Sequence, residues 1–438
     1  MSGKRKILII GGGFTGLTAA LRLSADPQCE VTIVEASDRL GGLAGGFPLG
    51  GTSLEKTYHH LFLTDTSILD LVKELGLQDK LIWCASSVGI YRDGRIHSFK
   101  TPKDLLCFSP CSFIGRVRTG VAALYLKHRK NWRGFTRQTA HEWMCRACGA
   151  SAMETIWTPL LKGKFDRHYQ NVSMAWFWAR IHTRANSRSD GGGEKLGYFR
   201  GGFNVITVKL EEILRQRGVD LQTSISVERI TAEKTATING RTIAFDACIF
   251  TGSSPALARL LPAQDSLNDY AAKLRSIEYL GAICLIFTSS QSLGDFYWIN
   301  VNEPDAPFLV FIQHTRLIAP ENYGGKNVYY IGAYLAPEGK TFSLPEAGLT
   351  RLWFDYLKKM FPAFDESRVD ERHVFRFAAA QHIVDTAYEA KIPDYQTPLP
   401  GVFLSNFSQI FPEDRGTNFA VREGEKIAAL VRKSLQVA

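Results

Sequence analysis

The chain has 438 residues, of which 45% are hydrophobic and 22% are charged, so it can bury a large core and is long enough for two or three domains. No stretch reaches the roughly 18 consecutive apolar residues that a membrane-spanning helix needs, and the apolar run at residues 7–10 is too short for a signal peptide, so we expect a cytoplasmic protein. The formal net charge of +9 fits a nucleic acid, an anionic membrane surface or an anionic substrate, and does not choose among them.

The chain begins with the pattern of a nucleotide-binding unit. Residues 6–10 form a short apolar run typical of a buried parallel strand, and residues 17–23 follow a helical pattern. Between them lies a G-x-G-x-x-G motif formed by Gly11, Gly13 and Gly16, with Phe14 and Thr15 inside it. The first glycine allows a tight turn, the second lets the backbone approach a pyrophosphate, and the third lets helix and strand pack closely. The helix N-terminus then offers free N–H groups to the phosphates.

The acidic residue that such a unit requires follows at the predicted distance. A second strand at residues 30–34 ends in Glu35, about 20 residues after the glycines, where a carboxylate can bind an adenosine ribose. NAD and FAD share these features. The continuation E-x-x-x-R-x-G-G, with Arg39, Gly41 and Gly42, extends the pyrophosphate site with an arginine and a second glycine pair.

With this motif the sequence resembles the FAD-dependent amine oxidase superfamily, which includes monoamine oxidases, protoporphyrinogen oxidases and phytoene-type desaturases. The resemblance implies one non-covalently bound FAD. It also implies an α/β fold with a glutathione-reductase-like, Rossmann-type FAD-binding domain and a mixed α+β substrate domain.

Three later segments resemble the same superfamily, so the match covers most of the chain. In the family, the residue that matches Val227 contacts the adenine through its backbone. The segment around Thr251 matches the strand and turn that reach back past the cofactor. Gly416, Asn418 and Phe419 match the start of the final helix, whose N-terminus points at the flavin N1 and O2 and favours the anionic reduced flavin.

The FAD-binding domain is therefore expected in separated pieces. We assign residues 1–98, 197–276 and 396–438 to it, and residues 99–196 (helical) and 277–395 (strand-rich) to the substrate domain. Apolar runs at residues 283–287, 308–312 and 328–331 fit strands of one sheet.

A basic stretch at residues 116–137 contains apolar residues among its Lys, Arg and His. This pattern suits peripheral contact with an anionic membrane, and it equally suits a solvated helix face. Cys145 and Cys148 form a C-x-x-C in a helical run, where a zinc site is not expected, so we predict no metal.

Flavin carries out the electron transfer in such enzymes, so no catalytic triad is required. His59 and His60 are candidate proton donors or anion ligands, and strand alternation would let one of them face the flavin. Arg376 and Arg415 are candidate ligands of an anionic substrate. Further pocket candidates are Gln313, His314, Thr315, Gln381, His382, Tyr388 and Asp414.

We predict an FAD-dependent oxidase, dehydrogenase or desaturase that moves a hydride from a lipophilic or amphipathic substrate to flavin N5. We expect a small-molecule or lipid-like substrate and no nucleic acid. Amine oxidases of the superfamily usually carry a lysine near N5, where this sequence has Cys284, so simple amines are not expected substrates. The alternative is a redox-neutral sugar mutase similar to UDP-galactopyranose mutase, which would suit the positive charge and the histidines.

Overall fold

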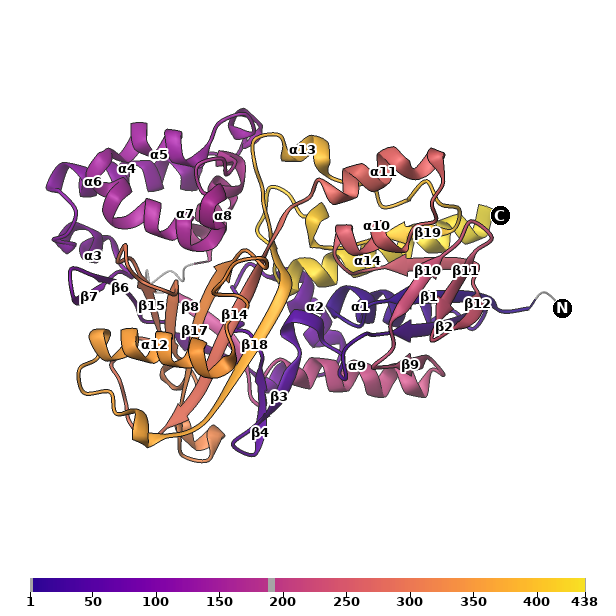
Figure 1. Ribbon diagram of the computed structural model, residues 1–438, viewed down its shortest axis with the longest axis horizontal. Coiled ribbons are helices and arrows are strands. Elements are labelled where there is room, and N and C mark those ends of the chain that lie inside the picture. Colours follow the sequence, from indigo (N-terminus) through magenta and orange to yellow (C-terminus); the bar gives the residue numbers. More distant parts are fainter. Residues whose placement is uncertain (1–2, 188–193, 438) are drawn as a thin grey trace.

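The computed structural model describes residues 3–187 and 194–437. Its α-helices, shown in Figure 1, are α1 (Phe14–Leu23), α2 (Thr66–Glu74), α3 (Pro102–Cys107), α4 (Phe113–His128), α5 (Ala140–Cys148), α6 (Ala150–Ala152), α7 (Thr158–Phe165), α8 (Met174–Asn186), α9 (Asn204–Gln216), α10 (Ser254–Leu260), α11 (Asp265–Arg275), α12 (Glu346–Met360), α13 (Tyr388–Lys391) and α14 (Thr417–Val437). Its strands are β1 (Arg5–Ile10), β2 (Cys29–Val34), β3 (Gly46–Leu49), β4 (Thr52–Glu55), β5 (Leu81–Ala85), β6 (Val88–Arg92), β7 (Arg95–Ser98), β8 (Lys195–Phe199), β9 (Asp220–Gln222), β10 (Val227–Ile230), β11 (Thr235–Ile238), β12 (Arg241–Ala244), β13 (Ala247–Phe250), β14 (Tyr279–Ser289), β15 (Trp298–Val301), β16 (Val310–Gln313), β17 (Asn327–Leu335), β18 (Val369–His382) and β19 (Val402–Leu404).

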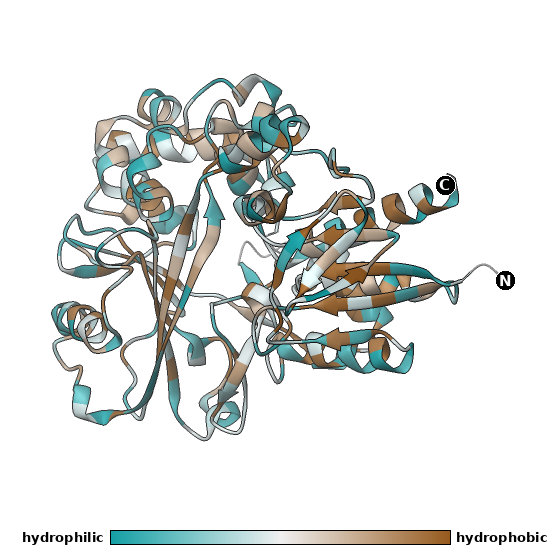
Figure 2. Ribbon diagram, turned by 45° about the vertical axis from the view of Figure 1, so that its right-hand side comes forward, coloured by the Kyte–Doolittle hydropathy of each residue, from teal (hydrophilic) through white to brown (hydrophobic). Residues whose placement is uncertain are grey.

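A five-stranded parallel sheet forms the first part of the molecule, in the order β19-β13-β1-β2-β9. Its strands come from the beginning, middle and end of the chain, and Figure 2 shows them as largely hydrophobic segments. Strand β1 is buried on both faces, which explains its unbroken apolar sequence. Ile7 and Ile9 pack in the cluster that contains residues of α1 and α14, whereas Leu8 and Ile10 pack toward β10 and β11. The predicted α/β class with a Rossmann-type sheet is confirmed.

A seven-stranded sheet forms the second part, in the order β18-β14-β17-β16-β15-β6-β7. Its neighbours are antiparallel except for the β15·β6 pair. The predicted strands at residues 283–287, 308–312 and 328–331 lie in this sheet as β14, β16 and β17. One face is covered by α12, whose Trp353, Phe354 and Leu357 pack with Leu285 and Phe287 of β14.

The sheet corrects one expected boundary. Residues 1–98 were assigned to the FAD-binding domain, yet β6 pairs with β15 and β7 pairs with β6. These two strands therefore belong to the substrate-side sheet. A contact between distant parts of the chain explains the difference. Strand β15 has a free edge at which β6 can pair, and this pairing buries Ile90 and Tyr91 of β6.

A helical region formed by α3 to α8 lies beside the seven-stranded sheet and is drawn in purple in Figure 1. It has a core of its own, which includes Met144, Ile156, Phe165 and Trp176. No helix of the described residues is both long and apolar enough to cross a membrane.

Candidate cofactor and substrate site

The glycine motif after β1 lies against a second glycine segment with no room for side chains, and we call the strip of exposed backbone where they meet the groove. Gly11 has φ +112°, and a Cβ on it would clash with the Thr251 hydroxyl. A Cβ on Gly16 would clash with the carbonyl oxygen of Gly11, as expected where helix and strand pack closely. Gly42 has φ +58°, and a Cβ on it would come within 3.1 Å of the Gly13 Cα. The two glycine segments thus lie against each other, and the Gly41 N–H donates to the Gly12 carbonyl at 2.8 Å.

The start of α1 presents its N–H groups to this groove. Its N-cap is Gly13, and no side chain caps the helix. Uncapped N–H groups and the positive helix end attract phosphate. Phe14, Thr15 and Gly16 supply this first turn.

Glu35 lies at the tip of β2, beside the glycine loop. Its Oε2 accepts from the Gly12 N–H at 2.7 Å, and its Oε1 accepts from the Ser37 N–H at 2.8 Å. The backbone of Ile225, two residues before Val227, donates to the Glu35 carbonyl at 2.9 Å. Glu35 and the start of β10 therefore lie together, while the Arg39 side chain is largely exposed. This arrangement fits the predicted adenosine end of a dinucleotide.

A cleft that is partly open to solvent lies between the seven-stranded sheet, helices α7 and α8, and the start of α14. Its lining comes from separate parts of the chain: the segment after β4, helices α7 and α8, strands β14 and β17, and the start of α14. Gly416, Thr417, Asn418 and Phe419 contribute the turn that opens α14. The start of α14 thus lies at the cleft, and its predicted contact with the flavin stays a prediction.

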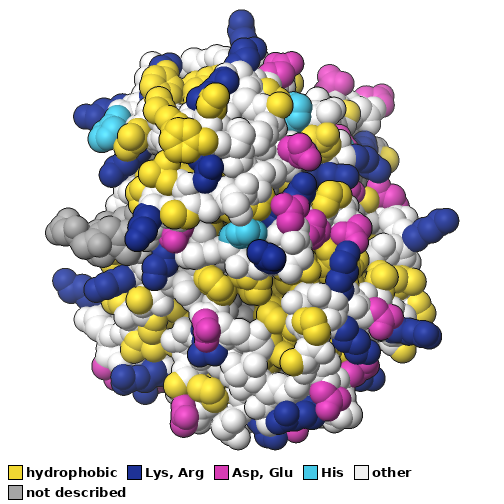
Figure 3. All heavy atoms as spheres, turned by 90° about the vertical axis from the view of Figure 1, so that its left-hand side faces the viewer, with side chains coloured by type: hydrophobic (Ala, Val, Ile, Leu, Met, Phe, Trp, Pro, Cys, Tyr) yellow, Lys and Arg dark blue, Asp and Glu magenta, His cyan; other side chains and the backbone are white. Residues whose placement is uncertain are grey.

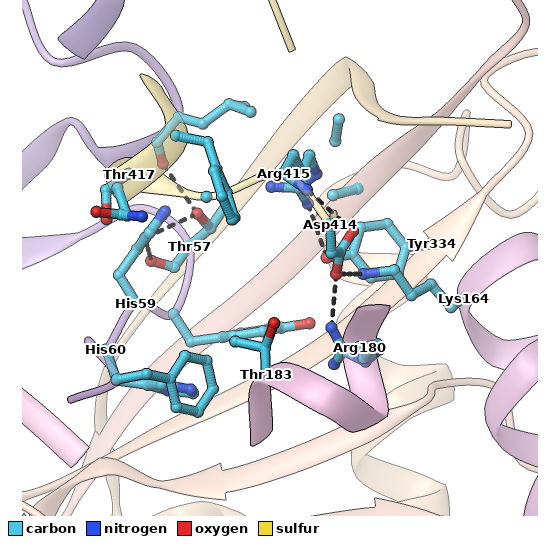
Figure 4. Close-up of a pocket in the computed structure, with 18 of the residues that line it drawn as sticks. Thr57, His59, His60, Lys164, Arg180, Thr183, Tyr334, Asp414, Arg415 and Thr417 are labelled. Atoms are coloured by element: carbon cyan, nitrogen blue, oxygen red, sulfur yellow. Dashed lines mark hydrogen bonds and ion pairs between the residues drawn. The ribbon is translucent and has the colours of Figure 1, made fainter. Parts of the chain in front are cut away.

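Asp414 is the centre of a group of charged side chains in the cleft (Figure 4). Its Oδ2 accepts from Lys164 Nζ at 2.7 Å and from an Arg180 guanidinium nitrogen at 2.5 Å, and its Oδ1 lies 3.3 Å from Trp176 Nε1. Burial alone would raise the pKa of Asp414, but the charges of Lys164, Arg180 and Arg415 outweigh it and hold that pKa well below its usual value. Asp414 is therefore ionised.

Lys164 differs from the other cations in that burial changes its charge state. Burial, aided by the charges of Arg180 and Arg415, lowers the pKa of Lys164 to about 7 although Asp414 opposes this change. Lys164 consequently gains and loses its proton near neutral pH.

Positive charge exceeds negative charge in the cleft. The lining contains Lys164, Arg180, Arg184 and Arg415, against Asp65 and Asp414. Arg415 donates to the Tyr334 hydroxyl at 2.8 Å, and its buried Nε has no hydrogen-bond partner among the described residues. A buried donor without a partner is costly unless a bound molecule accepts from it. The cleft is thus suited to a ligand with an anionic or carbonyl group.

His59 and His60 both line the cleft. They belong to an irregular segment rather than a strand, so the strand alternation expected from the sequence does not apply. Burial lowers the pKa of His59 to about 4 and that of His60 to about 3, with the Arg415 charge also lowering the former. Both rings are neutral at pH 7 and lack the charge that the predicted anion ligands would need.

Apolar and aromatic groups form the remaining walls. Cys284 of β14 lines the cleft, and burial raises the pKa of its thiol to about 12. Tyr58 meets Trp298 edge to face, with ring centroids 5.0 Å apart. A neutral thiol beside aromatic rings favours an apolar part of a substrate.

Several predicted residues do not line the cleft. Arg376 donates to the carbonyl groups of Phe342 and Leu344 and ties β18 to the loop before α12. His314 is bonded to Tyr323 at 2.7 Å, and the Tyr388 hydroxyl donates to the Ser408 carbonyl. The residues concerned are Arg376, Gln313, His314, Thr315, Gln381, His382 and Tyr388.

Three of the four cations that line the cleft were not predicted from the sequence: Lys164, Arg180 and Arg184. A signal for the last two was available, because Arg180, Thr183 and Arg184 have the i, i+3, i+4 spacing of one helix face. Lys164 contacts Asp414, which is 250 positions away in the sequence, so no pattern of neighbouring residues could have predicted this contact.

Among residues 3–187 and 194–437, no three His, Cys, Asp or Glu side chains are placed to hold a metal ion. Cys145 and Cys148 lie on helix α5, as the sequence predicts.

Comparison with known families gives a match to the model of flavin-containing amine oxidoreductases over residues 14–412. Among curated proteins, the chain is 28% identical over 237 residues to coproporphyrinogen III oxidase of Bacillus subtilis, which covers 51% of this chain and 50% of that protein. It is 25% identical over 242 residues to flavin-containing amine oxidase B of Sus scrofa, which covers 50% and 44%. The chain thus spans about half the length of these relatives.

Solved structures resemble the whole chain. A protein described as a putative protoporphyrinogen oxidase from Exiguobacterium sp. 255-15 matches 99% of this chain and 100% of its own, with a TM-score of 0.77 and 18% identity. Reduced UDP-galactopyranose mutase matches 99% of this chain and 94% of its own, with a TM-score of 0.77 and 16% identity. At these identities the likeness concerns the fold, and it confirms the predicted two-part architecture.

Proposed function

Since the chain belongs to the flavin-containing amine oxidoreductase family, with FAD as its cofactor, we propose that it oxidises an anionic, amphipathic substrate by hydride transfer. The predicted resemblance to the FAD-dependent amine oxidase superfamily is confirmed. FAD supplies a hydride acceptor at its N5 atom when bound. The substrate class and the direction of hydride transfer, from substrate to FAD, are what we propose.

The proposed FAD contacts follow the groove. Gly11, Gly13, Gly16, Gly41 and Gly42 let the backbone approach the pyrophosphate, together with the first turn of α1. Glu35 binds the adenosine ribose, and Val227 and Thr251 flank the adenine end and the glycine loop. The start of α14, with Gly416, Asn418 and Phe419, faces the flavin and favours negative charge there.

The excess of positive charge in the cleft is the observation that supports an anionic substrate. An amine substrate enters as an ammonium ion, and Lys164, Arg180 and Arg415 would repel it. A carboxylate or phosphate would instead accept from the Arg415 Nε, which lacks a partner among the described residues. Cys284, Tyr58 and Trp298 provide apolar walls for the rest of the molecule.

These contacts would orient the substrate and exclude water from its reacting carbon. Loss of a hydride from a carbon next to nitrogen or oxygen must be accompanied by loss of a proton. The neutral rings of His59 and His60 are acceptors for that proton.

The test is anaerobic reduction of the FAD-loaded protein, followed by flavin absorbance. Coproporphyrinogen III, which carries carboxylates and gives its name to relatives of this chain, should bleach the flavin band. Its methyl ester, which keeps the ring system but carries no carboxylate charge, is the matched control and should react at least about tenfold more slowly, since one lost charge-assisted contact corresponds to about 1.4 kcal/mol or more. Faster reduction by a primary amine than by any anionic compound would refute the proposal.

A second candidate is a redox-neutral sugar mutase, favoured by the same cationic groups because a sugar-nucleotide diphosphate would bind to them. It predicts that protein kept reduced by dithionite interconverts UDP-galactopyranose and UDP-galactofuranose, measured by chromatography. No conversion, together with flavin reduction by a carboxylate substrate, would eliminate this candidate.

A further inference from the structure

Helix α4 carries a row of large apolar side chains on the outside of the molecule. Phe113 is 65% exposed, Ile114 69%, Val121 62% and Leu124 60%, and Val117 and Tyr125 are exposed as well. We call these six residues the α4 ridge. Figure 3 shows hydrophobic side chains gathered over the helical region, with Lys and Arg around them. An exposed apolar patch of this kind marks an interaction site.

The residues of α4 fall on two opposite arcs around the helix axis. At 100° per residue, the six ridge residues fall within one arc of about 120°. Gly115, Thr119, Ala122 and Leu126 fall on the opposite arc and are buried against the rest of the helical region. The ridge is therefore not needed to hold α4 on the protein.

Cations occupy the borders between these two arcs. Arg116 and Lys127 lie on one side of the ridge, and Arg118 and Arg129 lie on the other. Residues 105–141 contain seven Lys and Arg and no Asp or Glu. None of the seven forms an ion pair with a carboxylate in the described part of the chain; Arg116 and Arg118 instead donate to backbone carbonyls.

We propose that the α4 ridge and its flanking cations dock on the surface of an anionic lipid bilayer. An apolar helix face lined by Lys and Arg on both sides is the layout that interfacial helices use. The positive charge beside the ridge favours a lipid bilayer over a second copy of the chain as the binding partner. A second copy of the chain, docked face to face, would bring two sets of unpaired cations together, whereas anionic headgroups would neutralise them.

The docked face adjoins the cleft. Helix α4 packs on α8, where the Trp178 Nε1–H donates to the Arg129 carbonyl at 2.9 Å. The opposite side of α8 brings Arg180, Thr183 and Arg184 to the cleft. If the proposed function is correct, an amphipathic substrate in the bilayer would lie one helix away from the site; the docking itself does not depend on that function.

The test is sedimentation of the FAD-loaded full chain with vesicles. With equimolar phosphatidylcholine and phosphatidylglycerol we expect binding that weakens when NaCl is raised from about 0.1 M to about 1 M, because salt screens the headgroup charge. With phosphatidylcholine alone we expect at least about tenfold less binding. The double variant V121E/L124E should bind the mixed vesicles at least about tenfold less than the parent chain.

The control is V208E, since Val208 is 54% exposed on α9, away from the ridge. It should bind as the parent chain does, and flavin content of all variants establishes that they are folded. No binding to the anionic vesicles, or equal binding of V121E/L124E and V208E, would overturn the proposal. So would light scattering that shows a dimer which V121E/L124E dissociates, because the ridge would then be an interface between copies.

Discussion

The charge state of Lys164 is determined by its surroundings rather than by its residue type. An exposed lysine stays protonated through pH 9, whereas burial among Arg180 and Arg415 brings the pKa of Lys164 to about 7. Its positive charge is present below that pH and is lost above it. Any step that needs the charge must therefore fail as the pH rises.

This predicts a pH profile. The second-order rate constant for flavin reduction by a carboxylate substrate should fall as pH rises through about 7, because it follows the free enzyme. K164M should lower the rate below pH 7 by about tenfold or more and remove the fall. K164R should keep a high rate to higher pH, because arginine stays charged. A parent profile that is flat from about pH 6 to about pH 9 would contradict the role of Lys164.

Gly16 leads to a second prediction at the same scale. G16A would press its new Cβ on the Gly11 carbonyl and push apart the strand and helix that form the groove. We expect the dissociation constant of FAD to rise at least about tenfold, which corresponds to about 1.4 kcal/mol, measured by titrating the apoprotein with FAD and following flavin fluorescence. Gly120, inside α4, is the matched control, because a Cβ there meets nothing closer than 3.8 Å. If G120A and G16A bind FAD equally tightly, the groove is not the cofactor site.

At the scale of elements, Asp414 joins three helices at the cleft. It precedes α14 and bonds to Lys164 of α7 and to Arg180 of α8. The side chains of Asp414 and Lys164 are 15% and 13% exposed, and that of Arg180 is 37% exposed. Removing the carboxylate leaves these cations without a counter-charge.

D414N should therefore lower the free energy of unfolding of the FAD-loaded protein by about 2 kcal/mol, measured by urea denaturation. Loss of one partner from a fully buried pair costs about 3–5 kcal/mol, and the exposure of Arg180 reduces this figure. D305N, which breaks the surface pair with Lys359, is the control and should unfold at the same urea concentration as the parent. Equal effects of the two variants would show that Asp414 is not structural.

At the scale of the whole molecule, the five-stranded sheet is complete only when the last segment is present. Strand β19 pairs with β13, and α14 packs on α1, where a Cβ on Gly424 would lie 2.6 Å from the Thr15 carbonyl oxygen. Ile427 and Val431 are fully buried in the same core.

A chain that ends at residue 395 lacks β19 and α14, and we expect it to be insoluble or to contain no flavin. The exposed β13 edge and the uncovered α1 face explain this outcome. Removal of residues 437 and 438 alone should leave solubility and flavin content unchanged. A soluble 395-residue product that binds FAD would show that the parallel sheet forms without its last strand.

The local sequence determined the nucleotide-binding unit. The strand, the glycines at 11, 13 and 16, the helix and Glu35 lie within 35 residues, and each has a short-range physical reason that leaves a pattern in the chain. The buried strands were predictable from their continuous apolar runs, whereas the start of α14 was expected from the family resemblance. These features identify a dinucleotide-binding fold, and the E-x-x-x-R-x-G-G continuation, through the family resemblance, pointed to FAD.

Tertiary structure alone decided the rest. The boundary at residue 98 failed because β6, which pairs with β7, finds its other partner, β15, about 200 residues later. Arg376 and Arg415 are alike in sequence, yet one bonds to backbone carbonyls and the other enters the cleft. The charge of Lys164 and the neutrality of His59 and His60 depend on burial by distant segments, and burial is a property of the folded chain that no short stretch of sequence contains.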